Sequence, residues 1–120
     1  MSISSSSSLP VKRFGQLIEL KSEFYAAYKS SHSASSPGVR DLLVKYHLRN
    51  FSIFHQVLGE KHLLFLYGEY TGSNYDADML ALSAEPRDLA WHVTHDEMQK
   101  SVRSDGKPGW CEMECVYYNA

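Results

Sequence analysis

The sequence predicts an α+β domain of the ferredoxin-like, split βαβ type, in which two helical crossovers cover one face of a four-stranded antiparallel sheet. Two observations support this prediction. Segments with strand character and segments with helical periodicity follow one another in the order β, α, β, β, α, β. The chain has 120 residues and 43% hydrophobic content, which is enough for one hydrophobic core but not for two.

The first strand and the first helix are predicted from the start of the folded region near Lys12. Residues 14–20 alternate in a way that favours a strand with both faces partly covered. Ser22 is then expected to cap a helix, with Glu23 in the first turn and His32 near the end. The preceding residues 1–11, dominated by serine, are predicted to form a disordered tail, and residues 12–120 the folded domain.

The first crossover is predicted to be broken into two helical segments. A serine-rich tract at 33–36 interrupts the helical pattern, and Pro37 suits the first turn of a second helix. That second helix is indicated by an apolar stripe at helical spacing. The stripe consists of Val39, Leu42, Leu43 and Tyr46.

A hairpin is predicted next, from strands at 50–57 and 61–70 joined by a turn at Gly59 and Glu60. Alternation should place Phe51, Ile53 and His55 on one face of the earlier strand. After the turn-forming residues 72–74, apolar residues recur at helical spacing, and a helix restarted by Pro86 is expected to run to about Arg103. A polar turn at 104–108 and a final strand at 110–118 complete the prediction.

Composition narrows the possible partners. The formal net charge is -2 and the basic residues are scattered, so nothing indicates binding to nucleic acid. The longest apolar stretch is far below the roughly 18 residues of a membrane span, and an apolar signal-peptide run is missing at the start. We therefore expect a cytoplasmic protein without membrane or nucleic-acid partners. Because the predicted sheet has a face without helices, we also expect a homodimer.

The first candidate for chemistry is a phenol and an imidazole on one helical face. Tyr28 and His32 are four residues apart, and residues at this spacing are neighbours on a helix. The pKa of an unperturbed imidazole, about 6.5, lets it exchange protons near neutrality. Taken alone, the pair is better explained as a half-buried helix surface closed by an exposed histidine.

A second cluster contains Trp91, His92, His95 and Asp96. The two histidines lie one helical turn apart and could be considered as metal ligands, but the motif is short and zinc sites usually need further ligands from elsewhere. The simpler interpretation, preferred for His95 in particular, is a polar helix face that Trp91 anchors to the core. We therefore expect no metal site here.

Several motifs in the same order resemble the L-rhamnose mutarotase family over about residues 12–118. They are Tyr28 with His32, the segment 50–53, Trp91 and His92 followed by Asp96 and Met98, and a closing 116–118. The resemblance implies a dimeric ferredoxin-like α/β barrel that interconverts the α and β anomers of a free sugar without a cofactor. It also implies that His32 is the proton donor, and that Tyr28 binds substrate.

The chain departs from the family pattern at two positions. Phe51 stands where the family has a substrate-binding tyrosine, and His92 stands where the family has a second tryptophan. Loss of one hydrogen bond typically costs about 0.5 to 1.5 kcal/mol, so these changes affect the choice of sugar more than the reaction type. We thus expect a mutarotase for L-rhamnose or a related deoxy sugar, with His32 as general acid. The site would be lined by Tyr28, Phe51, Trp91 and His92.

Two alternatives remain open from the sequence. One is a non-catalytic dimeric ferredoxin-like protein that binds a small ligand or a partner. The other is a cofactor-free oxygenase on the same fold, which would need a bulkier apolar pocket than the polar and aromatic residues here suggest.

Overall fold

The computed structural model describes residues 10–36 and 38–120. The predicted tail at 1–11, apart from Pro10 and Val11, and the predicted helix start at Pro37 lie outside the described residues. The elements in chain order are β1 (Lys12–Leu20), the 3₁₀ turn η1 (Ser22–Phe24), α1 (Tyr25–Ser31), α2 (Arg40–Lys45), β2 (Leu48–Leu58), β3 (Lys61–Tyr70), α3 (Tyr75–Ala84), α4 (Pro86–Asp96), β4 (Gln99–Lys100) and β5 (Cys111–Met113).

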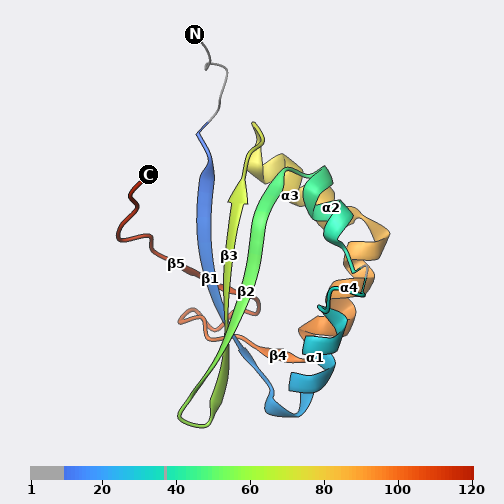
Figure 1. Cartoon of the computed structure of the whole chain (residues 1–120), viewed down its shortest axis with the longest axis vertical. Helices are drawn as coiled ribbons and strands as arrows, with labels where there is room; N and C mark the ends of the chain where they lie inside the picture. Colours follow the sequence, from blue (N-terminus) through green and yellow to red (C-terminus); the bar gives the residue numbers. More distant parts are fainter. Residues whose placement is uncertain (1–9, 37) are drawn as a thin grey trace.

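The predicted fold class is confirmed. The strands form one antiparallel sheet in the order β2-β3-β1-β4, with β5 also paired to β1. All four α-helices lie against the same face of this curled sheet, whereas β5 and the C-terminal end lie away from them (Figure 1). The first crossover is divided into α1 and α2, as the serine tract predicts. Among the described helices, none has the length and apolar character needed to cross a membrane.

The β2-β3 hairpin forms part of the sheet beneath the helices. Leu58 pairs with Lys61, so Gly59 and Glu60 form the predicted turn, and Gly59 takes the positive φ of 62° that glycine tolerates best. The other end of β2 contains a bulge between Arg49 and Ser52, with φ of 50° at Asn50.

The core lies between the helices and the inner face of the sheet. Phe14, Ile18 and Leu20 of β1 are buried there together with Leu64 of β3. The strand period of two explains this pattern, since alternate residues point toward the helices. Packing is close at Gly68, where a Cβ atom would lie 2.6 Å from the Phe14 ring.

The prediction that Ser22 caps the first helix is wrong. Ser22 begins the 3₁₀ turn η1, in which the Phe24 N–H donates to the Lys21 carbonyl oxygen, and no side chain caps α1. The chain leaves β1 through this tighter turn because Leu20 is held in the sheet and Tyr28 must reach the core.

The predicted helix from Pro86 to about Arg103 is too long at its end. The helix α4 stops at Asp96, because Met98 turns inward and is buried in the core beside Ile18. The carbonyl oxygen of Met98 accepts a hydrogen bond from the Lys21 N–H, and the next two residues pair with β1 as β4. Tertiary packing therefore overrides a helical pattern that continues in the sequence.

The predicted last strand at 110–118 is also shorter in the structure. Only β5 pairs with β1, opposite Gly15, Gln16 and Leu17, while β4 occupies the far end of the same edge. Residues 114–118 form no strand, and Val116 and Tyr117 are largely exposed. The fourth position of the sheet is thus filled by two short segments.

Candidate functional site

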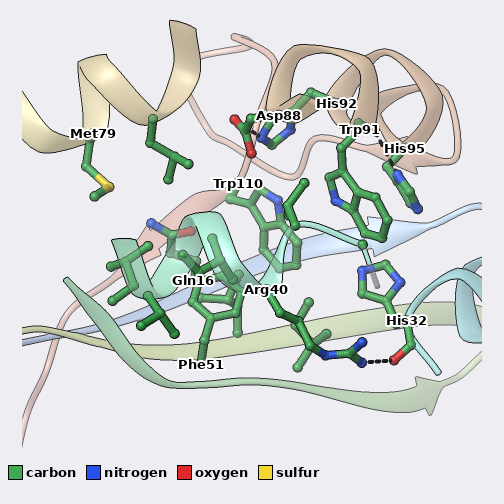
Figure 2. Close-up of a pocket in the computed structure, with 18 of the residues that line it drawn as sticks. Gln16, His32, Arg40, Phe51, Met79, Asp88, Trp91, His92, His95 and Trp110 are labelled. Atoms are coloured by element: carbon green, nitrogen blue, oxygen red, sulfur yellow. Dashed lines mark hydrogen bonds and ion pairs between the residues drawn. The ribbon is translucent and has the colours of Figure 1, made fainter. Parts of the chain in front are cut away.

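A cavity of about 610 Å³ lies between the helices and the sheet, within the size range of small-molecule sites. Its walls include all five residues that the sequence singled out: Tyr28, His32, Phe51, Trp91 and His92. They come from the end of α1, the start of β2 and the inner face of α4 (Figure 2). The structure therefore brings together residues that are up to 64 positions apart in the chain.

His32 is fixed at the C-terminal end of α1 by contacts on both sides of its ring. It stacks on Tyr28 with ring centroids 4.1 Å apart and meets Trp91 edge to face at 5.0 Å. Its Nδ1 lies 2.7 Å from the Tyr28 carbonyl oxygen, which can only accept, so Nδ1 carries a proton. Among the described residues no hydrogen bond engages Nε2, which leaves that nitrogen for a ligand.

Burial lowers the pKa of His32 below its usual 6.5, and this effect is the largest. The hydrogen bond to the Tyr28 carbonyl opposes it, whereas the charges of His95 and Arg40 act in the same direction as burial. Arg40 donates to the His32 carbonyl oxygen at 2.9 Å and holds the following loop, as the dashed line in Figure 2 marks. The neutral imidazole, with Nε2 as an acceptor, is therefore the favoured form near pH 7.

Behind His32, Ser31 connects two imidazoles. Its Oγ atom lies 2.7 Å from His95 Nε2 and 3.1 Å from His32 Nδ1. His95 Nδ1 lies 2.7 Å from the Trp91 carbonyl oxygen and must donate to it. His32 Nδ1 donates toward Tyr28 and Ser31, and the Ser31 hydroxyl can donate to His95 Nε2 or to the Tyr28 carbonyl oxygen, which lies 2.9 Å away.

The interpretation of His95 as part of a polar helix surface is wrong. His95 is only 4% exposed and stacks on Trp91 at a centroid distance of 3.9 Å. The spacing offers the missing signal, because a residue four positions after a core-facing tryptophan lies on the same helical face. Ser31, three positions after Tyr28, could have been found in the same way.

Tyr28 is a structural support as well as part of the cavity wall. Its side chain is buried, and burial raises the pKa of its phenol to about 12, against the smaller opposing effect of a hydrogen bond from Gln99. The Gln99 amide donates to the phenol oxygen at 3.4 Å. The phenol therefore keeps its proton at neutral pH and can donate one hydrogen bond.

Aromatic rings form the apolar part of the cavity. Phe51 follows the positive-φ Asn50 in the β2 bulge and is 36% exposed, and Trp91 reaches down from α4. Trp110, just before β5, adds a further ring that the sequence did not single out (Figure 2). Further lining residues that the sequence did not single out are Gln16, Arg40, Asp88 and Gln99.

Asp88 and His92 form a polar end of the cavity. The Asp88 carboxylate lies 3.3 Å from His92 Nε2, and Asp96 lies 3.6 Å from His92 Nδ1. Asp88 is only 3% exposed, and burial raises the pKa of its carboxyl more than His92 lowers it. His92 contacts Asp88 and Asp96, whereas His95 contacts Ser31 and the Trp91 carbonyl oxygen. The two imidazoles therefore do not point toward a common metal position. Within residues 10–36 and 38–120, no group of three or more His, Cys, Asp or Glu side chains is placed so that it could hold a metal ion.

Solved structures share this architecture. An L-rhamnose mutarotase from Formosa agariphila superposes with a TM-score of 0.67 at 22% identity, over 91% of this chain and 99% of the other. A candidate antibiotic biosynthesis monooxygenase from Nitrosomonas europaea superposes with a TM-score of 0.51 at 13% identity, over 93% of this chain and 98% of the other. At these identities the likeness establishes the fold alone.

The sequence assigns the family independently of these solved structures. No curated protein matches the chain. The family model for L-rhamnose mutarotase matches residues 13–119, which run from the second residue of β1 through all four helices and beyond β5. The chain therefore belongs to the L-rhamnose mutarotase family of isomerases that act on carbohydrates.

Proposed function

We propose that the protein interconverts the α and β anomers of free L-rhamnose or a related deoxy sugar, and that His32 carries the proton. Family membership supports the substrate class. The observation that carries the residue assignment is the tethered imidazole: Nδ1 is held by the Tyr28 carbonyl, and Nε2 is left for a ligand in the cavity. Such a group can accept and donate protons at a fixed position.

The proposed reaction needs only a proton transfer at two neighbouring oxygens. Neutral His32 Nε2 takes the proton of the anomeric hydroxyl, and the bond from the anomeric carbon to the ring oxygen breaks. The anomeric oxygen becomes an aldehyde, and the imidazolium gives the same proton to the ring oxygen. Rotation of the aldehyde and the reverse transfers close the ring as the other anomer. The single imidazole acts as base and then as acid, which includes the predicted donor role.

The remaining residues would hold the sugar. Trp91 and Phe51 offer apolar faces to the carbon skeleton, and the protonated phenol of Tyr28 can donate to a sugar oxygen. His92 would line the other end of the cavity, where its ring contacts Asp88. The reaction requires no cofactor, since every proton that moves returns to the sugar.

We also propose that the protein acts as a homodimer. The sheet face without helices presents the aromatic rings of Phe54 and Tyr67, and Phe54 is 63% exposed. Arg13 of the same face stacks on Tyr118 at 3.8 Å from the ring centroid. Apolar patches of this kind commonly mark contacts between copies of a chain.

Saturation transfer between the anomeric protons in NMR tests the proposed reaction. The protein should accelerate exchange for L-rhamnose, with L-fucose and D-glucose as comparison sugars. The variant His32→Gln should lose at least about a hundredfold of the acceleration, as expected for an acid/base residue. The matched variant His62→Gln, outside the cavity, should keep it.

Two results would oppose the proposal in different ways. If His32→Gln retains the acceleration, another group moves the proton. If the wild-type protein binds a sugar without accelerating its exchange, the non-catalytic alternative is correct.

A further inference from the structure

The strongest unexplained feature of the cavity is the buried carboxylate of Asp88. It projects from α4 into the cavity and is 3% exposed (Figure 2). Among residues 10–36 and 38–120, its one hydrogen-bonding or ionic partner is His92, whose nitrogen lies 3.3 Å away. A carboxylate can accept about four hydrogen bonds, so most of its capacity is unused.

A buried carboxylate with few hydrogen-bond partners destabilises the protein when no ligand is bound. A buried acceptor without a partner carries its desolvation cost, and this cost is larger for a charged group. Native structures rarely keep such groups unless a ligand or water completes their bonding. The helix dipole favours an acid in the first turn of α4 but does not require its carboxylate to be buried and to face the cavity. The carboxylate therefore indicates a hydroxyl-bearing ligand.

Helix geometry relates Asp88 to the proton-transfer end of the cavity. Asp88 and His95 are seven residues apart, which is nearly two turns and about 10 Å along one face of α4. The His95 ring lies 5.2 Å from the His32 ring, and Trp91 lies between Asp88 and His95 (Figure 2). Asp88 and His32 both line the cavity, so a ligand that contacts the His32 ring can extend along Trp91 toward the Asp88 carboxylate.

We infer that Asp88 accepts hydrogen bonds from the sugar hydroxyls farthest from the anomeric carbon, and that it selects sugars carrying two adjacent hydroxyls at that end. The inference rests on the proposed function and deepens it. With the anomeric carbon at His32, the ring lies along Trp91, and its far edge meets the two carboxylate oxygens. His92 is held between Asp88 and Asp96 and keeps the carboxylate oriented. Asp88 is thus a specificity-determining residue.

The variant Asp88→Asn tests this role, because it keeps the shape of the side chain and removes one acceptor and the charge. Saturation transfer should show a KM for L-rhamnose raised about tenfold or more, with kcat changed much less. The control Asp76→Asn alters an exposed acid at the start of α3 and should leave both parameters unchanged.

Deoxy analogues give the sharper result. For the wild-type protein, L-rhamnose analogues lacking the 3- or 4-hydroxyl should lose about tenfold or more in kcat/KM, because the carboxylate is left unpaired. For Asp88→Asn this penalty should shrink to about threefold or less, since neutral amides lose less when a partner is removed. An unchanged KM together with an unchanged deoxy penalty overturns the inference.

A binding measurement separates this inference from the proposed reaction. Addition of L-rhamnose should raise the Tm of the wild-type protein more than that of Asp88→Asn, while the sugar-free variant should unfold at the same or a higher temperature than wild type. If the wild type accelerates no exchange but shows this difference, the proposed reaction fails and the Asp88 site stands. If the two proteins respond equally to the sugar, the Asp88 site fails whatever the activity.

Discussion

The hydroxyl oxygen of Ser31 lies 2.7 Å from Nε2 of His95, although the two residues are 64 positions apart in the chain. This contact joins the end of α1 to the end of α4 directly behind His32. Since His95 is also held by the Trp91 carbonyl, the ring of His32 rests against a rigid support rather than against solvent. The position of the His32 ring therefore depends on Ser31 and His95, which contact each other beside it.

Removing the bridging hydroxyl should loosen this support. We expect Ser31→Ala to lower kcat about three- to tenfold with little change in KM, because the orientation of His32 is affected more than the cavity shape. The pH dependence of kcat should move as well, since Ser31 contacts His32 Nδ1 at 3.1 Å. Saturation transfer across a pH series measures both effects. Ser30→Ala, an exposed serine one position earlier, is the control, and equal profiles for the two variants would contradict a positioning role.

The pKa of His32 makes a directional prediction for activity. Burial lowers this pKa below 6.5, so the neutral base predominates above the folded-state pKa and is lost as the pH falls through it. The rate should therefore rise with pH in the acidic range and level off by neutrality. The same shift makes His32 contribute to stability fully above pH 6.5, and this contribution declines as the pH falls toward the folded pKa. NMR titration of the His32 ring, compared with the pH-rate profile, checks both. A rate that falls between pH 5 and 8 would show that the imidazolium is the resting acid.

Most elements of the fold can be predicted from local sequence patterns, and the predictions that are wrong have physical causes. The strand at 61–70 and the broken first crossover are predicted correctly because alternation and the serine tract are strong local signals. The ends of α4 and β5 are not predicted correctly, since they depend on the burial of Met98 and on which part of the β1 edge is free to pair.

The residues of the cavity also divide into those that the sequence predicts and those that it does not. Helical spacing and family resemblance identify Tyr28, His32, Trp91 and His92 as candidate site residues, and all four line one cavity in the structure. Spacing alone does not reveal the contact between Ser31 and His95, because it joins two helices. It also does not reveal that Asp88 is buried, since a lone acid in the first turn of a helix is usually explained by the helix dipole.

Restoring a phenol on β2 should tighten sugar binding. Phe51→Tyr adds a hydroxyl to a ring in the cavity wall, and one new hydrogen bond of about 0.5 to 1.5 kcal/mol should lower the KM for L-rhamnose about two- to tenfold. Phe54→Tyr makes the same chemical change on the same strand but on the opposite face, and it should leave KM unchanged. Initial rates of saturation transfer over a range of sugar concentrations measure the effect. Equal KM values for Phe51→Tyr and wild type would place the sugar away from this ring.

A charge on the helix-free face should separate the proposed dimer. Phe54 is 63% exposed in the single chain, and the residues after β5 continue without a strand partner in the described structure, with Tyr117 78% exposed. A second copy packed on this face would bury both sets of rings, and a lysine at position 54 would have to be desolvated there. We therefore expect wild-type protein to have twice the chain mass in multi-angle light scattering and Phe54→Lys to have the mass of one chain. Leu80→Lys, which places the same charge on an exposed position of α3, should remain dimeric. If wild type has the mass of one chain at micromolar concentration, the exposed face of the sheet is not a dimer interface.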